Sequence, residues 1–349
     1  MGSMPSKTHI KNYTSIELFA GAGGLALGLE KAGFEHLMLN EIDKHAVATL
    51  KKNRPLWNSV CADIKSIDFT PYRGKVDLLT GGFPCQAFSY AGKKLGFEDT
   101  RGTLFFDFAR ALKESDATVF LAENVRGLLS HNEGKTLQSM LDVLDELGYH
   151  VFEPKVLKAI HHNVPQKRER LFIIGVKKAY RHHAVLEWPT PSSKIYTLKD
   201  ALLKGELYNS DVPPSAGQQY PQKKKEILQR IPPGGYWRDL PVTLQKEYLQ
   251  KSYYLGGGKT GIARRISWEE PCLTLTCSPA QKQTERCHPD ETRPFAVREY
   301  ARIQTFPDHW EFQGSTTQQY RQIGNAVPVN LAYAVGLSVA NLLKSIEDV

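Results

Sequence analysis

The chain has 349 residues and a hydrophobic fraction of 41%, which is enough for one large or two ordinary domains with a substantial core. No apolar run reaches the length of about 18 residues that a membrane span needs, so we expect no membrane partner. Five cysteines at irregular spacing indicate a reducing cytoplasm rather than a disulfide framework. The net charge of +8 is compatible with a polyanionic partner but does not define one.

The start of the chain predicts a strand, a glycine-rich turn and a helix. Residues 15–19 have the pattern of a strand, and residues 20–28 contain the glycines of the turn. Such a turn lets the backbone approach a ligand at the amino terminus of a helix. Gly21, Gly23 and Ala26 also fit the dinucleotide-binding fingerprint, a match that alone does not identify the ligand.

Acidic residues end the next two predicted strands. Glu41 closes the strand 36–41, at the position where folds of this kind hold the hydroxyl pair of a ribose. Asp63 follows a strand near residues 59–62 and is placed to accept from an adenine amino group. Strands that alternate with short helices predict an α/β fold with a doubly wound, mostly parallel sheet. Adenine and ribose occur in both NAD and S-adenosylmethionine, so both cofactors stay open here.

A cysteine follows the fourth predicted strand. The apolar run 76–80 is followed by two glycines and Pro84, and Cys85 then stands where open α/β sheets place their ligands. A thiolate is a strong nucleophile, whereas the alternative interpretation is a small buried core residue. A dehydrogenase would need no thiol at this position, so Cys85 favours the methyl donor S-adenosylmethionine over NAD.

Two more buried strands are predicted at residues 117–122 and 171–175, each beside a polar block. The helix predicted at 136–147 carries one apolar face, which we interpret as core packing.

Taken together, six blocks resemble the DNA (cytosine-5)-methyltransferase family of the bacterial and phage restriction-modification type. In chain order the blocks are 19–24, 84–86, 123–125, 166–170, 298–304 and 324–328.

The resemblance implies transfer of a methyl group to carbon-5 of cytosine in a specific double-stranded DNA sequence. In that family, a cysteine adds to carbon-6 so that carbon-5 can attack a sulfonium methyl group. Cys85 would be the nucleophile, Glu123 the proton donor near ring nitrogen-3, and Arg170 the residue that fixes the cytosine carbonyl, with Arg168 as a supporting or phosphate contact. Because a donating carboxyl must hold a proton, we expect burial to raise the pKa of Glu123. The target base must be flipped out of the duplex.

The resemblance also assigns ligand contacts. The implied contacts to S-adenosylmethionine, whose product is S-adenosylhomocysteine, are Phe19, Ala20, Gly21, Gly23, Gly24, Leu25, Glu41, Ile42, Asp63, Ile64, Pro84, Leu104, Asn325 and Ala326. The predicted DNA contacts near the nucleophile, on what resembles the family's mobile catalytic loop, are Gln86, Ser89, Lys93, Lys94 and Arg101. The candidate base-reading residues in the carboxyl half are Arg264, Arg265, Gln281, Lys282 and Arg286.

We expect three parts along the chain. Residues 1–187 would form the catalytic and cofactor-binding domain, with 1–14 as a tag or leader. Residues 188–296 would form a smaller, loop-rich target-recognition domain, since proline, glycine and basic residues interleaved with aromatics suit a DNA groove. A proline-rich domain with solvated charges is the alternative for this part. Residues 297–349 would return to complete the catalytic domain.

The cysteines of the carboxyl half raise the question of zinc. Cys272, Cys277, Cys287 and His288 lack the paired Cys-x-x-Cys spacing of most structural zinc sites, so we expect no metal.

Two functional alternatives stay open. One is the RNA-directed branch of the family, which methylates transfer RNA, and the other is an inactive DNA-binding relative. The long insertion argues against the first, and the intact catalytic residues argue against the second. The expected partners are double-stranded DNA and a cognate restriction endonuclease, for a monomeric enzyme in the bacterial cytoplasm that joins the nucleoid when bound to DNA.

Overall fold

The computed structural model describes residues 12–83, 103–257, 259–347 and 349. The predicted site residues that lie outside these ranges are Pro84, Cys85, Gln86, Ser89, Lys93, Lys94 and Arg101. The roles assigned to them stay predictions.

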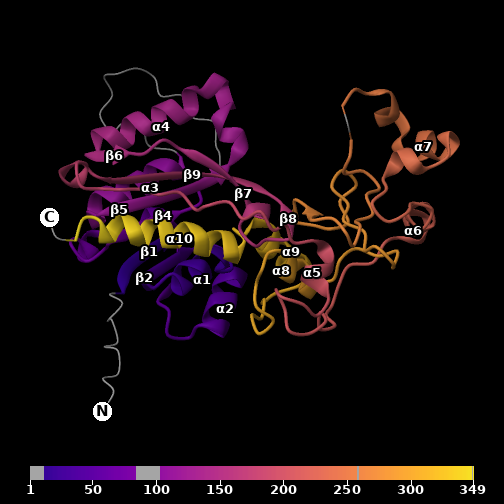
Figure 1. Ribbon diagram of the computed structural model, residues 1–349, viewed down its shortest axis with the longest axis horizontal. Coiled ribbons are helices and arrows are strands. Elements are labelled where there is room, and N and C mark those ends of the chain that lie inside the picture. Colours follow the sequence, from indigo (N-terminus) through magenta and orange to yellow (C-terminus); the bar gives the residue numbers. More distant parts are fainter. Residues whose placement is uncertain (1–11, 84–102, 258, 348) are drawn as a thin grey trace, which may run out of the picture.

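An eight-stranded sheet organises the described part of the chain (Figure 1). In spatial order its strands are β3 (Ser59–Cys61), β2 (Phe34–Glu41), β1 (Tyr13–Leu18), β4 (Leu78–Gly81), β5 (Val119–Val125), β9 (Glu169–Lys177) and β6 (Tyr149–Val151), with β7 (Lys155–Lys158) also pairing with β9. The strands from β3 to β5 pair in parallel, and β9 runs antiparallel to its neighbours. The order winds outward in both directions from β1 and β4, which confirms the predicted doubly wound α/β fold.

Helices cover the sheet as the apolar spacing predicts. The helices of this half are α1 (Gly24–Lys31), α2 (Lys44–Asn53), α3 (Leu104–Ser115) and α4 (Lys135–Glu146). In α4 the buried residues include Leu137, Met140 and Leu144, which confirms core packing on one helical face. All four residues of β4 are buried, as is typical of a parallel strand covered on both sides.

The last helix, α10 (Val329–Lys344), packs directly on α1 near the start of the chain (Figure 1). A Cβ atom on Gly28 would lie 2.3 Å from the Cβ of Ala332, so the two helices touch where glycine leaves room. The segment Thr316–Lys344 contains a window apolar and long enough to cross a membrane, but 61% of that window is buried inside the protein. We therefore interpret α10 as a core helix.

The carboxyl half is poor in regular structure. Its helices are α5 (Leu198–Leu202), α6 (Gln222–Leu228), α7 (Val242–Leu249), α8 (Val297–Ile303) and α9 (Thr316–Asn325). The short strand β10 (Cys272–Leu273) pairs in parallel with β8 (Gln166–Lys167). Helices α6 and α7 lie farthest from the sheet (Figure 1), over a small separate core of Tyr220, Ile227, Leu228, Ile231, Trp237, Leu240, Leu249, Ile262, Ala263 and Cys287.

Candidate active site

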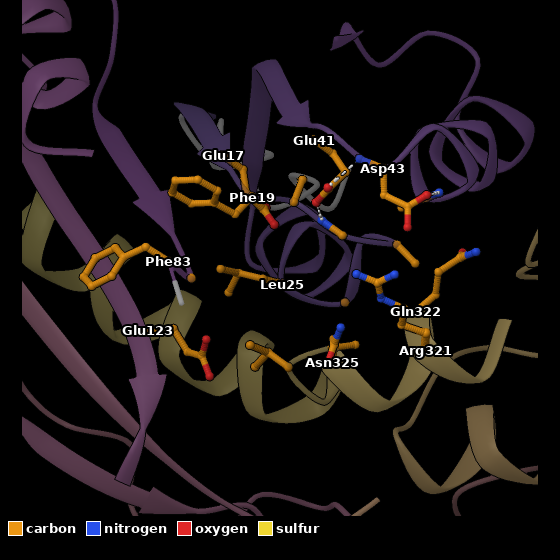
Figure 2. A pocket seen from close by; sticks show the side chains of 18 of the residues that line it. Glu17, Phe19, Leu25, Glu41, Asp43, Phe83, Glu123, Arg321, Gln322 and Asn325 are labelled. Carbon is orange, nitrogen blue, oxygen red and sulfur yellow. Dashed lines mark hydrogen bonds between the residues drawn. The ribbon is translucent and has the colours of Figure 1, made fainter. Parts of the chain in front are cut away.

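A cavity of about 390 Å³ opens at the carboxyl ends of β1, β2, β4 and β5 and is closed on one side by the end of α9 (Figure 2). The predicted cofactor residues that line it are Phe19, Ala20, Gly21, Gly24, Leu25, Glu41, Asn325 and Ala326. The predicted residues that the structure describes but places outside its lining are Gly23, Ile42, Asp63, Ile64 and Leu104. The glycine turn, the end of β2 and the end of α9, which the sequence linked to the cofactor, thus meet at one cavity.

Glu41 fixes the glycine-rich turn beside this cavity. Its Oε2 atom accepts a hydrogen bond from the backbone N–H of Gly21 at 2.8 Å. Its Oε1 atom accepts from the N–H groups of Ile42 and Asp43, each at 2.8 Å. A carboxylate has about four acceptor positions, so Glu41 retains capacity for a ligand hydroxyl while it holds the turn in place.

Glu17 is a lining residue that the sequence analysis missed. It is 2% exposed, and its Oε2 atom has no hydrogen-bond partner among the described residues. Burial and the nearby charge of Glu41 raise the pKa of Glu17 well above its usual value. An unpaired buried carboxyl is costly, and it suits the cationic group of a ligand. The signal in the sequence is an acid inside a predicted strand.

Glu123 and Arg170 meet at the other end of the cavity. Arg170 Nε lies 2.6 Å from Glu123 Oε1, and each side chain is 12% exposed. The two residues come from the adjacent antiparallel strands β5 and β9. A Cβ atom on Gly82 would lie 2.7 Å from Glu123 Oε2, so the glycine after β4 makes room for the carboxylate. The structure thus brings together the two side chains to which the family resemblance gave separate roles on the cytosine ring.

Burial raises the pKa of Glu123, while the positive charges of Arg170 and Arg168 oppose this shift. The direction agrees with the expected proton donor. The neighbouring Asn124 is buried, and its side-chain amide donates to the carbonyl of Phe83 at 2.9 Å. Phe83 is the last described residue before the segment that holds Cys85, so Asn124 anchors the backbone that leads to the predicted nucleophile.

Arg168 lies behind this site rather than in it. It is 1% exposed, and its Nη1 and Nη2 atoms donate to the carbonyls of Leu275 at 3.1 Å and Gly324 at 2.9 Å. The phosphate contact considered from the sequence is wrong, because a guanidinium this deeply buried cannot reach a DNA backbone. Burial and the charge of Arg170 lower the pKa of Arg168 to about 9.

Two of the candidate base-reading arginines need correction. Arg265 and Arg286 are each 4% exposed, and their guanidinium groups donate to backbone carbonyls. The groups that accept from Arg265 are the carbonyls of Leu228, Ile231, His288, Pro289 and Glu291 and the hydroxyl of Thr292. Arg286 donates to the carbonyls of Thr274 and Glu285. Both hold loops together and present no free edge to a base.

The other three candidates differ in exposure. The side chain of Arg264 is 14% exposed and pairs with Glu270 at 3.3 Å. Gln281 and Lys282 are exposed, and Lys282 Nζ donates to the carbonyl of Tyr248 at 2.7 Å. Gln281 and Lys282 therefore stay available as DNA contacts.

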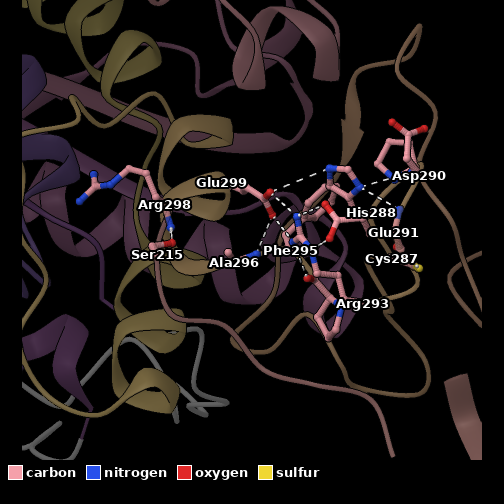
Figure 3. Close-up of polar contacts among 12 residues, drawn as sticks. Ser215, Cys287, His288, Asp290, Glu291, Arg293, Phe295, Ala296, Arg298 and Glu299 are labelled. Atoms are coloured by element: carbon pink, nitrogen blue, oxygen red, sulfur yellow. Dashed lines mark hydrogen bonds and ion pairs between the residues drawn. The ribbon is translucent and has the colours of Figure 1, made fainter. Parts of the chain in front are cut away.

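A bidentate ion pair joins Arg293, in the loop before α8, to Glu299 in the first turn of α8. Figure 3 shows Arg293 between Glu291 and Glu299, with its two Nη atoms each 2.8 Å from an oxygen of Glu299. Glu299 also accepts from the backbone N–H of Ala296 at 2.7 Å and so caps the start of α8. Among the described residues, no group of three or more His, Cys, Asp or Glu side chains could hold a metal ion.

Comparison with known proteins completes the assignment. Residues 13–341 match the family of C-5 cytosine-specific DNA methylases. The type II methyltransferase M.Eco47II of Escherichia coli is 67% identical over 345 residues, which is 98% of this chain and 83% of that protein. M.PspPI of Psychrobacter is 62% identical over 335 residues, 96% of this chain and 80% of its own. A solved structure described as a prophage-encoded DNA modification methyltransferase of E. coli has a TM-score of 0.73 at 25% identity and covers 95% of this chain and 100% of its own.

The sheet and its cavity define a methyltransferase that uses S-adenosylmethionine, and the chain belongs to the C-5 cytosine-specific DNA methylase family. It is a DNA cytosine-5 methyltransferase of the type II restriction-modification kind, and DNA is its substrate. The family and activity inferred from the six sequence blocks are confirmed.

Proposed function

We propose that the enzyme methylates one cytosine of a specific DNA sequence after that base has flipped into the cavity beside Glu123 and Arg170. The contact between these two side chains, 2.6 Å apart at the edge of the cavity that holds the glycine turn, is the observation that carries the proposal. A cytosine there would meet a carboxyl and a guanidinium at its polar edge. Flipping is required because the target atom is inaccessible inside a stacked duplex.

The residues of the cavity fit S-adenosylmethionine. Glu17 offers an unpaired buried carboxyl to a cationic group, and Glu41 offers acceptor capacity to the ribose hydroxyls. Gly21 and Gly24 allow close approach of the backbone. When bound, the cofactor supplies the methyl group on a sulfonium and becomes S-adenosylhomocysteine. No metal takes part in this proposal.

The protein groups then divide the chemistry. The thiolate of Cys85 forms a bond to carbon-6, and Glu123 gives its proton to ring nitrogen-3. Arg170 orients Glu123 and holds the cytosine carbonyl. After carbon-5 has been methylated, it loses its proton to a base and the Cys85 thiolate is eliminated from carbon-6. Ring nitrogen-3 returns its proton to Glu123, which restores the neutral ring and the enzyme.

Residues 188–296 would act as the target-recognition domain, inserted between the two parts of the catalytic domain. Its separate small core supports this division. We propose a monomer located in the cytoplasm and at the nucleoid, paired genetically with an endonuclease of the same specificity. The names of its type II methyltransferase relatives support this context. An isolated gene with no neighbouring endonuclease would contradict the pairing.

The test of the proposed chemistry is a covalent trap. A duplex with 5-fluorocytosine at the target should form a stable adduct with the wild-type protein, because fluorine cannot leave as a proton. The Cys85→Ala variant should form no adduct and transfer no methyl group, yet still bind DNA. Cys61→Ala, which removes an exposed thiol elsewhere in the chain, is the matched control and should trap normally. Adduct formation by Cys85→Ala would refute the assignment of the nucleophile.

Transfer RNA is the competing substrate. Incorporation of labelled methyl groups should be confined to duplex DNA, and equal labelling of transfer RNA would move the protein to the RNA-directed branch. Bisulfite sequencing of DNA from expressing cells would then map the target cytosine.

A further inference from the structure

The recognition segment, residues 274–277, docks on the end of α9, which forms one wall of the cavity. Arg168 ties the two together, because it donates to the carbonyls of Leu275 at 3.1 Å and Gly324 at 2.9 Å. The N–H of Leu275 donates to Gln166 Oε1 at 2.9 Å. Segment, helix end and the strand that precedes Arg170 are thus fixed to one another.

The backbone of the recognition segment is held on both of its sides. A Cβ atom on Gly324 would lie 2.2 Å from the carbonyl oxygen of Thr276 and 2.9 Å from the nitrogen of Cys277, so only glycine permits this approach. On the other side, the hydroxyl of Tyr300 donates to the Thr276 carbonyl at 2.9 Å and accepts from its N–H at 3.2 Å. A displacement of the segment would therefore shift the end of α9.

One side-chain contact extends this docking into the cavity. The exposed thiol of Cys277 donates to Oδ1 of Asn325 at 3.1 Å. With its oxygen engaged in this way, the amide directs its nitrogen towards the cavity, as Figure 2 shows. An amide that is turned over would instead present an acceptor.

The polarity of the cavity makes this orientation matter. Its lining includes the carboxyl groups of Glu17, Glu41, Asp43 and Glu123, which in their ionised form repel the carboxylate of a methionine-like ligand, and the guanidinium of Arg321, which attracts it. The neighbouring amide of Gln322 is already bonded to Gln313 and Thr49. A donor from Asn325 to an anionic oxygen would form a strong, charge-assisted hydrogen bond.

We propose that Cys277 is a positioning residue: its thiol holds the Asn325 amide with the donor facing the carboxylate of S-adenosylmethionine, and so links cofactor affinity to the docking of the recognition segment on DNA. The inference rests on the proposed location of the cofactor in this cavity. Because binding free energies are reciprocal, DNA and cofactor should each strengthen the binding of the other through this contact.

The test compares three single variants of the full chain by calorimetric titration with S-adenosylhomocysteine. Cys277→Ala should raise the dissociation constant about three- to tenfold, the range expected for one lost hydrogen bond. Cys277→Ser keeps a hydroxyl donor and should stay within about twofold of wild type. Ser278→Ala alters the next residue, whose hydroxyl bonds to Gln218 rather than to Asn325, and should bind normally.

A double-mutant cycle provides the decisive readout. If Cys277 acts through Asn325, then Cys277→Ala should have no further effect in an Asn325→Ala background. With target duplex present, the dissociation constant should improve by a smaller factor in Cys277→Ala than in wild type. Unchanged affinity in Cys277→Ala, an equal loss in Cys277→Ser, or equal improvement factors would each overturn the inference. Failure of the wild type to bind the cofactor at all would instead refute the proposed function.

Discussion

The two halves of the molecule satisfy their backbone carbonyl groups in different ways. In the sheet half, the N–H groups of neighbouring strands donate hydrogen bonds to these carbonyls, as along the seven residue pairs of β5 and β9. In residues 188–296, β10 is the one strand among the described residues, and it has two residues. Buried arginines take the place of strands there, with Arg265 alone bonded to five carbonyl oxygens. A guanidinium suits this task because it carries five donors in a fixed plane.

The contrast teaches that positive charge in this chain has two uses. The net charge of +8 is compatible with a polyanionic partner, but part of the positive charge lies inside the carboxyl half, where Arg265 and Arg286 hold loops. Exposed residues such as Lys282 remain the candidates for contact with DNA. Substitutions in the sheet half should therefore change catalysis, whereas substitutions of buried and exposed basic residues in the carboxyl half should change loop stability and DNA affinity, respectively.

After the complete loss of methyl transfer expected for Cys85→Ala, the largest effect is expected for Glu123→Gln, in the sheet half. Loss of the proton donor should lower the single-turnover rate by about 10²- to 10⁴-fold while DNA and cofactor still bind. Because burial raises the pKa of Glu123, the wild-type rate should fall as pH rises through that pKa. Rapid-quench rates across pH provide the measurement, and a wild-type profile without this fall would remove Glu123 from the mechanism.

The Arg265→Met substitution should destabilise residues 188–296 while it leaves the sheet intact. It leaves several buried carbonyls unpaired, each at a cost of about 1–3 kcal/mol, so we expect a loss of at least about 3 kcal/mol and of specific DNA binding. Cofactor affinity should persist. Denaturant unfolding and gel shift measure the two effects. Arg230→Met, at an exposed arginine, should change stability by less than about 0.5 kcal/mol; equal losses in the two variants would contradict the buried role.

Within the sheet half, Glu17→Gln should change stability and cofactor affinity in opposite directions. The raised pKa of Glu17 means that its contribution to stability is present below the unfolded pKa and lost as pH rises through the folded value. The glutamine variant should therefore be more stable than wild type without ligand, by about 1–3 kcal/mol, with a gap that grows with pH. Its affinity for S-adenosylmethionine should fall. Thermal unfolding across pH, with and without ligand, tests both; a pH-independent gap would refute the assignment.

The smallest effect is expected for Lys282→Ala, on the surface of residues 188–296. Its loss should weaken binding to all duplexes by a similar few-fold factor and reduce the salt slope of affinity by about one. Titrations at several salt concentrations measure this slope. Loss of discrimination between target and non-target duplexes would instead show that Lys282 reads a base edge.

The sheet half was largely predictable, because each motif there is tied to a regular element. The glycine turn, Glu41 and Glu123 each follow a strand whose apolar pattern is clear, and parallel strands bring their carboxyl ends together. The roles of Glu123 and Arg170 were given by the family resemblance, whereas the contact between the two side chains came from the structure. Glu17 was missed because a single acid in a strand has no periodic signature that separates a ligand contact from a solvated edge.

The carboxyl half resisted prediction for a physical reason. Burial in a helix or strand leaves a periodicity of 3.6 or 2 residues, whereas Arg265 and Arg286 are buried by loops that leave none. The adjacent Arg264 and Arg265 look equivalent in sequence, yet the first pairs with Glu270 and the second is enclosed by carbonyls. Which arginine turns inward depends on contacts distant in the chain.

The packing of α10 against α1 has a consequence for biosynthesis. The helix that follows the glycine turn is covered by a partner made about 300 residues later, since Gly28 contacts Ala332. A ribosome-bound chain that lacks α10 leaves the buried face of α1 uncovered, so partly translated enzyme should hold its cofactor poorly. Assembly should be slow because contacts such as this one join distant parts of the chain.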